Sequence, residues 1–193
     1  EHYTVSTALD ALSHAIESYL SPKSNEASEM YASFAAKHIW DVLFDGADGE
    51  GEKDAGGFTP TQRRRLSMAS MAAGIAINRT GTGFPHPMGY SITLSDGVPH
   101  GRACGAFEGA YIEYNMRTET GARKLTALAG ALGTTPAEMA RRIPLKADVK
   151  LVLTDDQMEE YISRVTQAAG FMNSPYVLSD SEKKEIYEKL FSL

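Results

Sequence analysis

One aspartate and three histidines have a spacing that allows metal chemistry. Asp10 and His14 lie four residues apart in a segment with helical periodicity, so they share one face of the predicted helix. His86 and His100 lie fourteen residues apart within residues 81–101, where glycines and prolines favour turns that can direct functional side chains. A carboxylate and several imidazoles together can bind a divalent cation such as Fe²⁺ or Zn²⁺.

Each of these features also has a purely structural interpretation. Taken alone, Asp10 and His14 are typical of a surface ion pair, worth about 0.2–0.5 kcal/mol. The segment with His86 and His100 is equally typical of a helix–helix connection with two exposed histidines. Cys104, one helical turn after His100, is expected to be an inert core residue.

Three functions are possible for such a cation site. The first is a metal-dependent oxidoreductase, which a family resemblance and not the residues themselves can indicate. The second is another non-haem metalloenzyme, such as an iron oxygenase or a metal hydrolase, that uses two histidines and a carboxylate of the same set. The third is a helical metal-binding domain without turnover. Oxygenase sites with two histidines and a carboxylate usually stand on β-barrels, for which this sequence has no strands, so the first interpretation is favoured over the second.

The elements that must position these residues are predicted to be helices throughout. Apolar stripes predict two helices before residue 46, and in the first of them the stripe lies opposite Asp10 and His14. Residues 101–116 and 118–132 also have helical periodicity. Capping sequences predict four further helix starts, at Thr59, Thr135, Thr154 (a helix ending at Gly170) and Ser179. The best strand-like run, 150–153, is too short to carry a sheet, so residues 1–193 are predicted to form a single all-α domain.

The composition excludes several classes of protein. The 193 residues are 42% hydrophobic and 23% charged, which is typical of a globular domain. A net charge of −6 is the wrong sign for binding nucleic-acid phosphates, and no apolar stretch approaches the roughly 18 residues of a membrane span. The single cysteine excludes a disulfide framework and favours a reducing compartment, so we expect a cytoplasmic protein that binds neither nucleic acid nor membrane.

The ordered pattern of these residues resembles the iron-containing (group III) alcohol dehydrogenases, which belong to the dehydroquinate synthase-like superfamily. The run D-A-L-S-H-A-I-E at 10–17 and the pair His86 and His100 carry the resemblance, with M-A-A-G-I-A at 71–76 and N-S-P at 173–175 in agreement. The resemblance covers the whole chain. It implies the helical C-terminal domain of that fold, with metal ligands and catalytic residues at Asp10, His14, His86 and His100.

The resemblance also implies an activity and its cofactors. Such an enzyme interconverts a small alcohol and an aldehyde or ketone with NAD or NADP, and Fe²⁺ or Zn²⁺ acts as a Lewis acid on the substrate oxygen. The nucleotide is expected to bind an N-terminal α/β domain that this chain lacks. The chain begins with Glu1 instead of Met, so we expect a piece of a longer protein, inactive alone and homo-oligomeric at full length.

One position departs from the family pattern. Tyr90 stands where many relatives carry a second histidine near the nicotinamide, and Tyr90 is therefore expected to contact the cofactor. A tyrosine hydroxyl donates a hydrogen bond but does not exchange its proton near neutral pH as an imidazole does. A proton relay through this position is therefore not expected.

Overall fold

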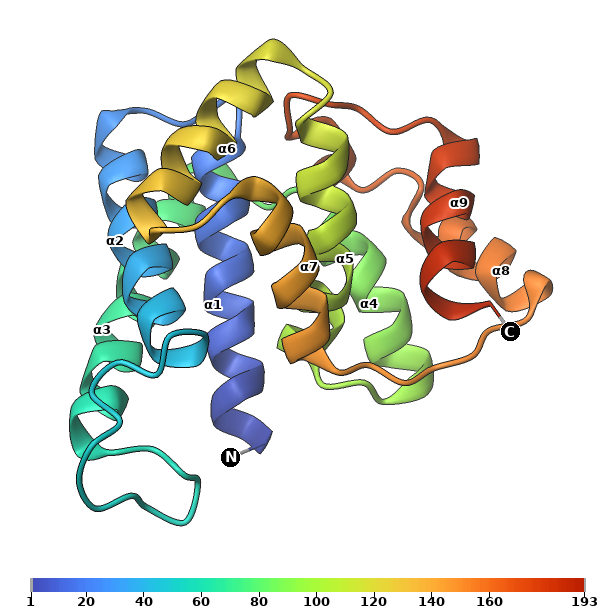
Figure 1. Cartoon of the computed structure of the whole chain (residues 1–193). Helices are drawn as coiled ribbons and strands as arrows, with labels where there is room; N and C mark the ends of the chain where they lie inside the picture. The colour runs from blue at the N-terminus through green and yellow to red at the C-terminus, as the bar shows by residue number, and fades with distance from the viewer. Residues whose placement is uncertain (1, 193) are drawn as a thin grey trace.

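The computed structural model describes residues 2–192, and helices are the only regular elements in them (Figure 1). In chain order they are α1 (His2–Leu20), α2 (Glu26–Leu43), α3 (Pro60–Thr80), α4 (Pro85–Asp96), α5 (His100–Asn115), α6 (Glu119–Leu132), α7 (Pro136–Ala147), α8 (Asp155–Val165), a 3-10 helix η1 (Ala169–Met172) and α9 (Asp180–Phe191). The predicted all-α fold is confirmed. Residues 150–153 form no strand, and at their end the Leu153 N–H donates to the carbonyl of Phe191 in α9.

The four predicted capping sequences begin helices as expected. The side chains of Thr59, Thr135, Thr154 and Ser179 each accept a hydrogen bond from the backbone N–H three residues later. These bonds satisfy N–H groups that have no partner within the helix. The starts of α3, α7, α8 and α9 are therefore encoded locally.

Two stretches differ from the sequence prediction. The segment 81–101 was expected to be turns, yet it contains α4, which starts at Pro85 and ends at Gly97 in a left-handed conformation with φ 69°. Proline is favoured in the first turn of a helix, where its missing N–H is not needed. Helix α8 ends at Val165 and not at Gly170. Gly170 lies in η1 and packs on Gly83, and a Cβ on Gly170 would lie 2.6 Å from the Gly83 carbonyl oxygen.

Helix α1 runs through the middle of the molecule and packs against α2, α3 and α5 (Figure 1). Its predicted apolar stripe is buried, but Glu17, which lies outside that stripe, and Ser13 at the edge of the stripe are also 0% exposed. Asp10 and His14 keep only 29% and 25% of their side-chain surface. Their interpretation as a surface ion pair therefore does not fit the structure.

Close helix contacts bring the predicted site residues together. A Cβ on Gly101, at the start of α5, would lie 1.8 Å from the carbonyl oxygen of Ser6 and 2.8 Å from Cβ of Asp10. A Cβ on Gly89 of α4 would lie 3.2 Å from the backbone nitrogen of Cys104 in α5. Glycine at these two positions lets α1, α4 and α5 approach one another at backbone distance.

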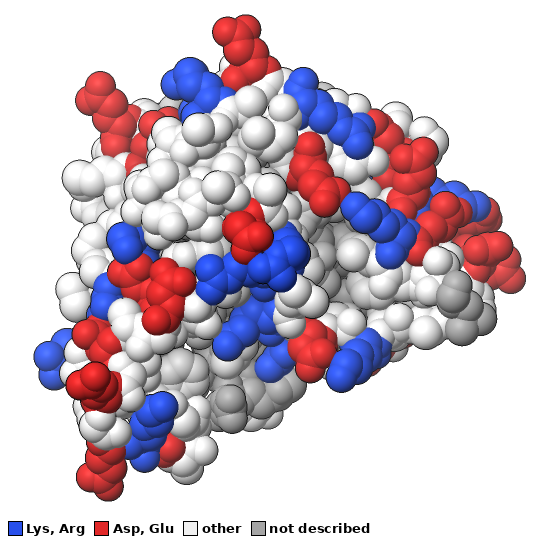
Figure 2. Space-filling view, in the orientation of Figure 1, with Lys and Arg blue, Asp and Glu red and all other residues white. Residues whose placement is uncertain are grey.

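The surface is mixed in charge. Figure 2 shows acidic and basic side chains interleaved over the viewed face. No helix within residues 2–192 has both the length and the apolar character needed to cross a membrane.

Candidate metal centre

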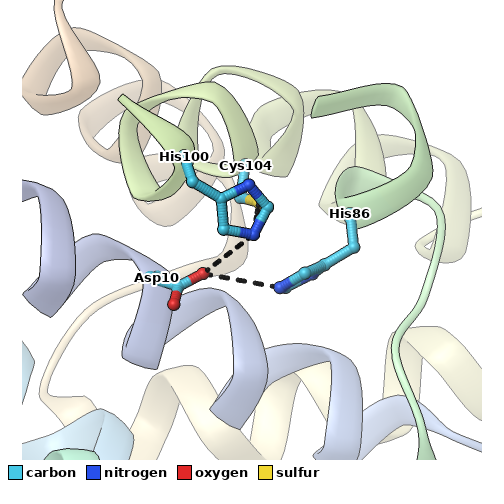
Figure 3. Close-up of side chains that lie close together, drawn as sticks. All are labelled: Asp10, His86, His100 and Cys104. Atoms are coloured by element: carbon cyan, nitrogen blue, oxygen red, sulfur yellow. Dashed lines mark hydrogen bonds and ion pairs between the residues drawn. The ribbon is translucent and has the colours of Figure 1, made fainter. Parts of the chain in front are cut away.

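Four side chains from three helices converge at one point. They come from α1 (Asp10), the first turn of α4 (His86) and α5 (His100 and Cys104), as Figure 3 shows. One ligand atom of each residue lies within 4.8 Å of the other three. Asp10 Oδ1 is 3.5 Å from Nε2 of His86 and 3.6 Å from Nε2 of His100. Oxygen, nitrogen and sulfur donors at this spacing are typical of a transition-metal site.

Two donor atoms in this group are buried and unpaired. Among the described residues, Asp10 Oδ1 and His86 Nε2 have no hydrogen-bond partner, and His86 is only 1% exposed. An unsatisfied buried polar atom costs about 1–3 kcal/mol, so two such atoms facing each other indicate a group bound between them. A divalent cation accepts lone pairs from a carboxylate oxygen and an imidazole nitrogen at once. The residues therefore fit a metal ion.

His14 lies beside the four converging residues. Its Nε2 is 4.0 Å from Asp10 Oδ1, and its ring stacks on that of His86 with centroids 4.6 Å apart and planes 12° apart. The structure thus places all four sequence-predicted ligands at one site, although α2 and α3 separate the first pair from the second. His14 lies at the edge of this site.

The other side of the His86 ring contacts a buried carboxylate. His86 Nδ1 lies 2.7 Å from Oε1 of Glu17, and the Gly83 N–H donates to the second oxygen of Glu17. An Nδ1–H that donates to Glu17 leaves Nε2 as the free nitrogen facing Asp10, an arrangement common behind metal-binding histidines. Sequence reasoning missed Glu17. The available signal was its position seven residues after Asp10, on the same helical face as His14.

Burial and charge set the protonation of these residues. Burial opposes ionisation of Asp10, but His86 and the other imidazoles outweigh it and hold the pKa of Asp10 below its ordinary value. Burial lowers the pKa of His14 and of His100, which favours the neutral, metal-binding form. Burial also disfavours the charged form of His86, yet Glu17 and Asp10 outweigh it and raise the pKa of His86.

A second buried carboxylate neighbours Glu17. Glu108 on α5 is 0% exposed, and within residues 2–192 neither of its oxygens has a hydrogen-bond partner. Burial, followed by the negative charge of Glu17, raises the pKa of Glu108 well above its ordinary value. The raised pKa favours the neutral carboxylic acid form of Glu108. The interior behind the His86–Glu17 pair is polar and closed to solvent.

Tyr90 lies at the solvent-exposed edge of the site. It is 46% exposed, and its ring stacks on that of His100 with centroids 5.0 Å apart and planes 5° apart. Its ring meets that of His86 edge-on, at 6.3 Å between centroids. Tyr90 therefore restrains the His100 imidazole and offers an aromatic surface next to the converging donors.

The sequence matches a family model described as "Fe-containing alcohol dehydrogenase family, C-terminal" over residues 4–190. Among curated proteins, 1-propanol dehydrogenase PduQ of Salmonella typhimurium is 30% identical over 135 residues, which are 70% of this chain and 35% of that protein. Choline dehydrogenase of Bacillus subtilis is 24% identical over 212 residues, which cover 100% of this chain and 50% of the relative. The chain thus spans half or less of the length of these relatives.

Solved structures agree with the family match. An iron-containing alcohol dehydrogenase of Thermotoga maritima superposes with a TM-score of 0.83 at 26% identity, covering 98% of this chain and 49% of that one. Sulfoacetaldehyde reductase of Bifidobacterium kashiwanohense, solved with NAD⁺, superposes with a TM-score of 0.81 at 23% identity. The match covers 97% of this chain and 50% of the reductase. At 23% identity, the likeness to the sulfoacetaldehyde reductase shows only that the fold is shared. Because the family model matches nearly the whole chain, this protein belongs to the Fe-containing alcohol dehydrogenase family and corresponds to its helical C-terminal domain.

Proposed function

We propose that this chain is the metal-binding half of an oxidoreductase that interconverts an alcohol and an aldehyde or ketone. In this proposal Fe²⁺ or Zn²⁺ is held by Asp10, His14, His86 and His100. The observation that carries the proposal is the pair of buried, unpaired donor atoms, Asp10 Oδ1 and His86 Nε2, which lie 3.5 Å apart in a chain of the alcohol dehydrogenase family.

The redox partner in this proposal is NAD or NADP, bound by an N-terminal α/β domain. The chain covers 35% and 50% of the two curated relatives, which leaves room in such proteins for a second domain. The reductase with a similar fold was solved with NAD⁺. We expect the chain to be inactive without that domain. A cytoplasmic location and a homo-oligomeric full-length protein remain predictions.

When bound, the metal supplies Lewis-acid polarisation of the substrate oxygen, which favours the alkoxide over the alcohol. The negative charge of Asp10 offsets part of the charge of the cation, and the imidazoles contribute neutral nitrogen donors. Glu17 accepts the Nδ1–H of His86, and this bond fixes the ring so that Nε2 faces Asp10. His86 is 1% exposed, whereas the side chains of Asp10, His14 and His100 keep 29%, 25% and 33% of their surface, so water reaches the site from their side.

Tyr90 is proposed to contact the nicotinamide ring. Its exposed aromatic surface lies next to the donors, and its stacking on His100 fixes its orientation. A tyrosine hydroxyl can donate a hydrogen bond to substrate or cofactor. The proton released in alcohol oxidation is expected to leave to solvent and not through this side chain.

Metal analysis tests the proposal directly. Elemental mass spectrometry of the purified chain is expected to find about one Fe or Zn per chain. His100→Ala is expected to lose tight metal binding, because it removes a nitrogen that lies 3.6 Å from Asp10 Oδ1.

His38→Ala is the matched control. His38 is a partly buried histidine of α2 whose Nδ1 accepts a hydrogen bond from Arg65, outside the site. The metal content of the His38→Ala variant should equal that of the parent chain. An unchanged metal stoichiometry in His100→Ala would contradict the ligand assignment.

A further inference from the structure

The outer side of the α2–α3 pair is apolar. Five large apolar side chains of these two helices are each 40–63% exposed to solvent: Met30, Phe34, Met68, Met71 and Ile75. The sequence has no charged residue at 30–36 or at 66–78. We call the surface formed by these five side chains the α2–α3 face.

Helix α3 has its large and small apolar residues on unexpected sides. Toward the core it presents mainly alanines, namely Ala69, Ala72, Ala73 and Ala76. Toward solvent it presents Met68, Met71 and Ile75, whose spacings of three and four residues place them in one stripe. A helix that borders water normally carries polar side chains on its outer stripe. The pattern of α3 is instead typical of a helix that is covered on both sides.

The apolar side chains of the two helices lie side by side. Helices α2 and α3 pack against each other and run in opposite directions (Figure 1). Arg65 of α3 donates a hydrogen bond to His38 of α2, which fixes their register. At a rise of 1.5 Å per residue, Met71 lies about 9 Å from Arg65 along α3, and Phe34 lies about 6 Å from His38 along α2 in the same direction. The α2–α3 face is therefore one continuous surface.

The α2–α3 face is separate from the candidate metal centre. That centre lies between α1 and the α4–α5 pair, whereas α2 and α3 lie on the other side of α1 (Figure 1). An apolar surface without charged residues offers no attraction to a polyanion such as nucleic acid. A second copy of the chain supplies a matching surface, because a two-fold axis brings identical apolar faces together.

The size of the α2–α3 face agrees with a dimer interface. Helices of 18 and 21 residues are about 27 and 32 Å long and about 10 Å wide, which gives a face of about 600 Å². Two such faces would bury about 1,200 Å², the lower limit for stable, specific interfaces. Patches of this size on monomeric proteins are often functional.

We infer that the α2–α3 face is the interface of a two-fold symmetric dimer of this chain. The family resemblance implies an oligomer but does not indicate which surface forms it. Methionine side chains suit such an interface, because they are flexible and adapt their shape to the opposite surface. The inference does not depend on the proposed metal chemistry, since none of the five side chains belongs to the candidate metal centre.

Analytical ultracentrifugation of the 193-residue chain tests the association. Between about 1 and 100 µM, the parent is expected to change reversibly from monomer to dimer, as a small interface gives a dissociation constant in the micromolar range. Met71→Glu should raise the dissociation constant at least about tenfold, because it places an unpaired charge inside the interface.

Met172→Glu is the matched control for Met71→Glu. Met172 lies in η1 and is 68% exposed, compared with 63% for Met71, so both variants introduce the same charge at a similarly exposed methionine. The control should associate like the parent. Circular dichroism establishes that both variants are folded.

Methionine methyl resonances locate the interface without any substitution. The chain contains eight methionines, three of them in the α2–α3 face. In methyl-labelled parent protein, raising the concentration should shift or broaden the signals of Met30, Met68 and Met71, and it should leave those of Met172 and the buried Met139 unchanged.

Two results would overturn the inference. One is a parent chain that stays monomeric up to about 100 µM, where a specific interface of this size should be occupied. The other is a dimer in which the signals of the three α2–α3 face methionines do not respond. The methyl spectra of the parent decide between these results even if Met71→Glu fails to fold.

Discussion

Glu17 is a carboxylate with no exposure to solvent, a state that folding tolerates only where the group is paired. Its partners are His86 Nδ1 and the Gly83 N–H, so one buried side chain connects α1 to the start of α4. The hydrogen bond to His86 determines which ring nitrogen faces Asp10. At the scale of single residues, Glu17 therefore prepares a metal ligand without contacting the metal position itself.

Two substitutions separate the charge of Glu17 from its geometry. Glu17→Gln keeps an oxygen that can accept from His86, whereas Glu17→Leu removes the acceptor and leaves the Gly83 N–H unpaired. We expect Glu17→Leu to weaken metal affinity about 10–100-fold, with Glu17→Gln between it and the parent. Competition with a chromophoric chelator at fixed pH measures both. Equal affinity of the parent and a folded Glu17→Leu chain would mean that Glu17 only fills space.

The sequence predicted four residues of the candidate site. Three of them, Asp10, His86 and His100, converge in the structure, and His14 lies beside them. Histidines and an aspartate stand out because they are the usual metal donors, and the family pattern links pairs that lie far apart in the chain. Glu17 was missed because its importance depends on a tertiary contact, with His86 from α4.

At the scale of helices, the contact between α1 and α5 positions the site. Gly101 lies against Ser6 and Asp10 with no room for a Cβ, so the first turn of α5, which carries His100, rests directly on α1. The distance between Asp10 and His100 is therefore set by backbone packing and not by side-chain flexibility.

Gly101→Ala tests this packing. Its Cβ would lie 1.8 Å from the Ser6 carbonyl oxygen, so α5 must move away from α1. We expect the free energy of unfolding to fall by about 1–3 kcal/mol or more, together with the metal affinity. Urea unfolding and metal titration measure the two effects.

Gly130→Ala is the control for that substitution. Gly130 lies on an exposed face of α6, and a Cβ there would meet nothing within 4 Å. Alanine in an open helical position should stabilise the chain by about 0.5–1 kcal/mol. If both substitutions had the same small effect, the close α1–α5 contact would not constrain the fold.

Helix starts were predictable where the signal is local, as at Thr59 and Ser179, whose side chains cap the following turn. Helix α4 was not predicted, because its glycine and prolines resemble a turn when tertiary packing is unknown. Pro85 is compatible with a first helical turn, and Gly89 permits the close contact with α5. The central position of α1 was also hidden, because its polar residues on the second face suggested solvent.

At the scale of the whole molecule, Glu108 links folding to pH. Its pKa is raised in the folded chain, so the folded state keeps a proton that the unfolded state releases above the ordinary carboxyl pKa. The contribution of Glu108 to stability is therefore lost as pH rises through its raised pKa, by at most about 1.4 kcal/mol per pH unit.

Glu108→Gln removes this titration and keeps the shape of the side chain. Relative to the parent, the metal-free variant should gain unfolding free energy as pH rises from 5 to 7, by at most about 1.4 kcal/mol per pH unit. Urea unfolding at both pH values measures the difference, with Glu113→Gln, an exposed position on α5, as the control. A parent and a Glu108 variant with parallel pH profiles would show that Glu108 is ionised in the folded chain.

The donors of the metal site belong to α1, α4 and α5, and two whole helices separate the first of these from the others. A cation bound by Asp10, His86 and His100 therefore closes a long loop of polypeptide and acts as a reversible cross-link. Ligands that bind only the native state stabilise it by mass action, and closing a long loop restricts the unfolded chain most. If the proposed cation binds there, its removal is expected to lower the free energy of unfolding, because the chain then loses this cross-link.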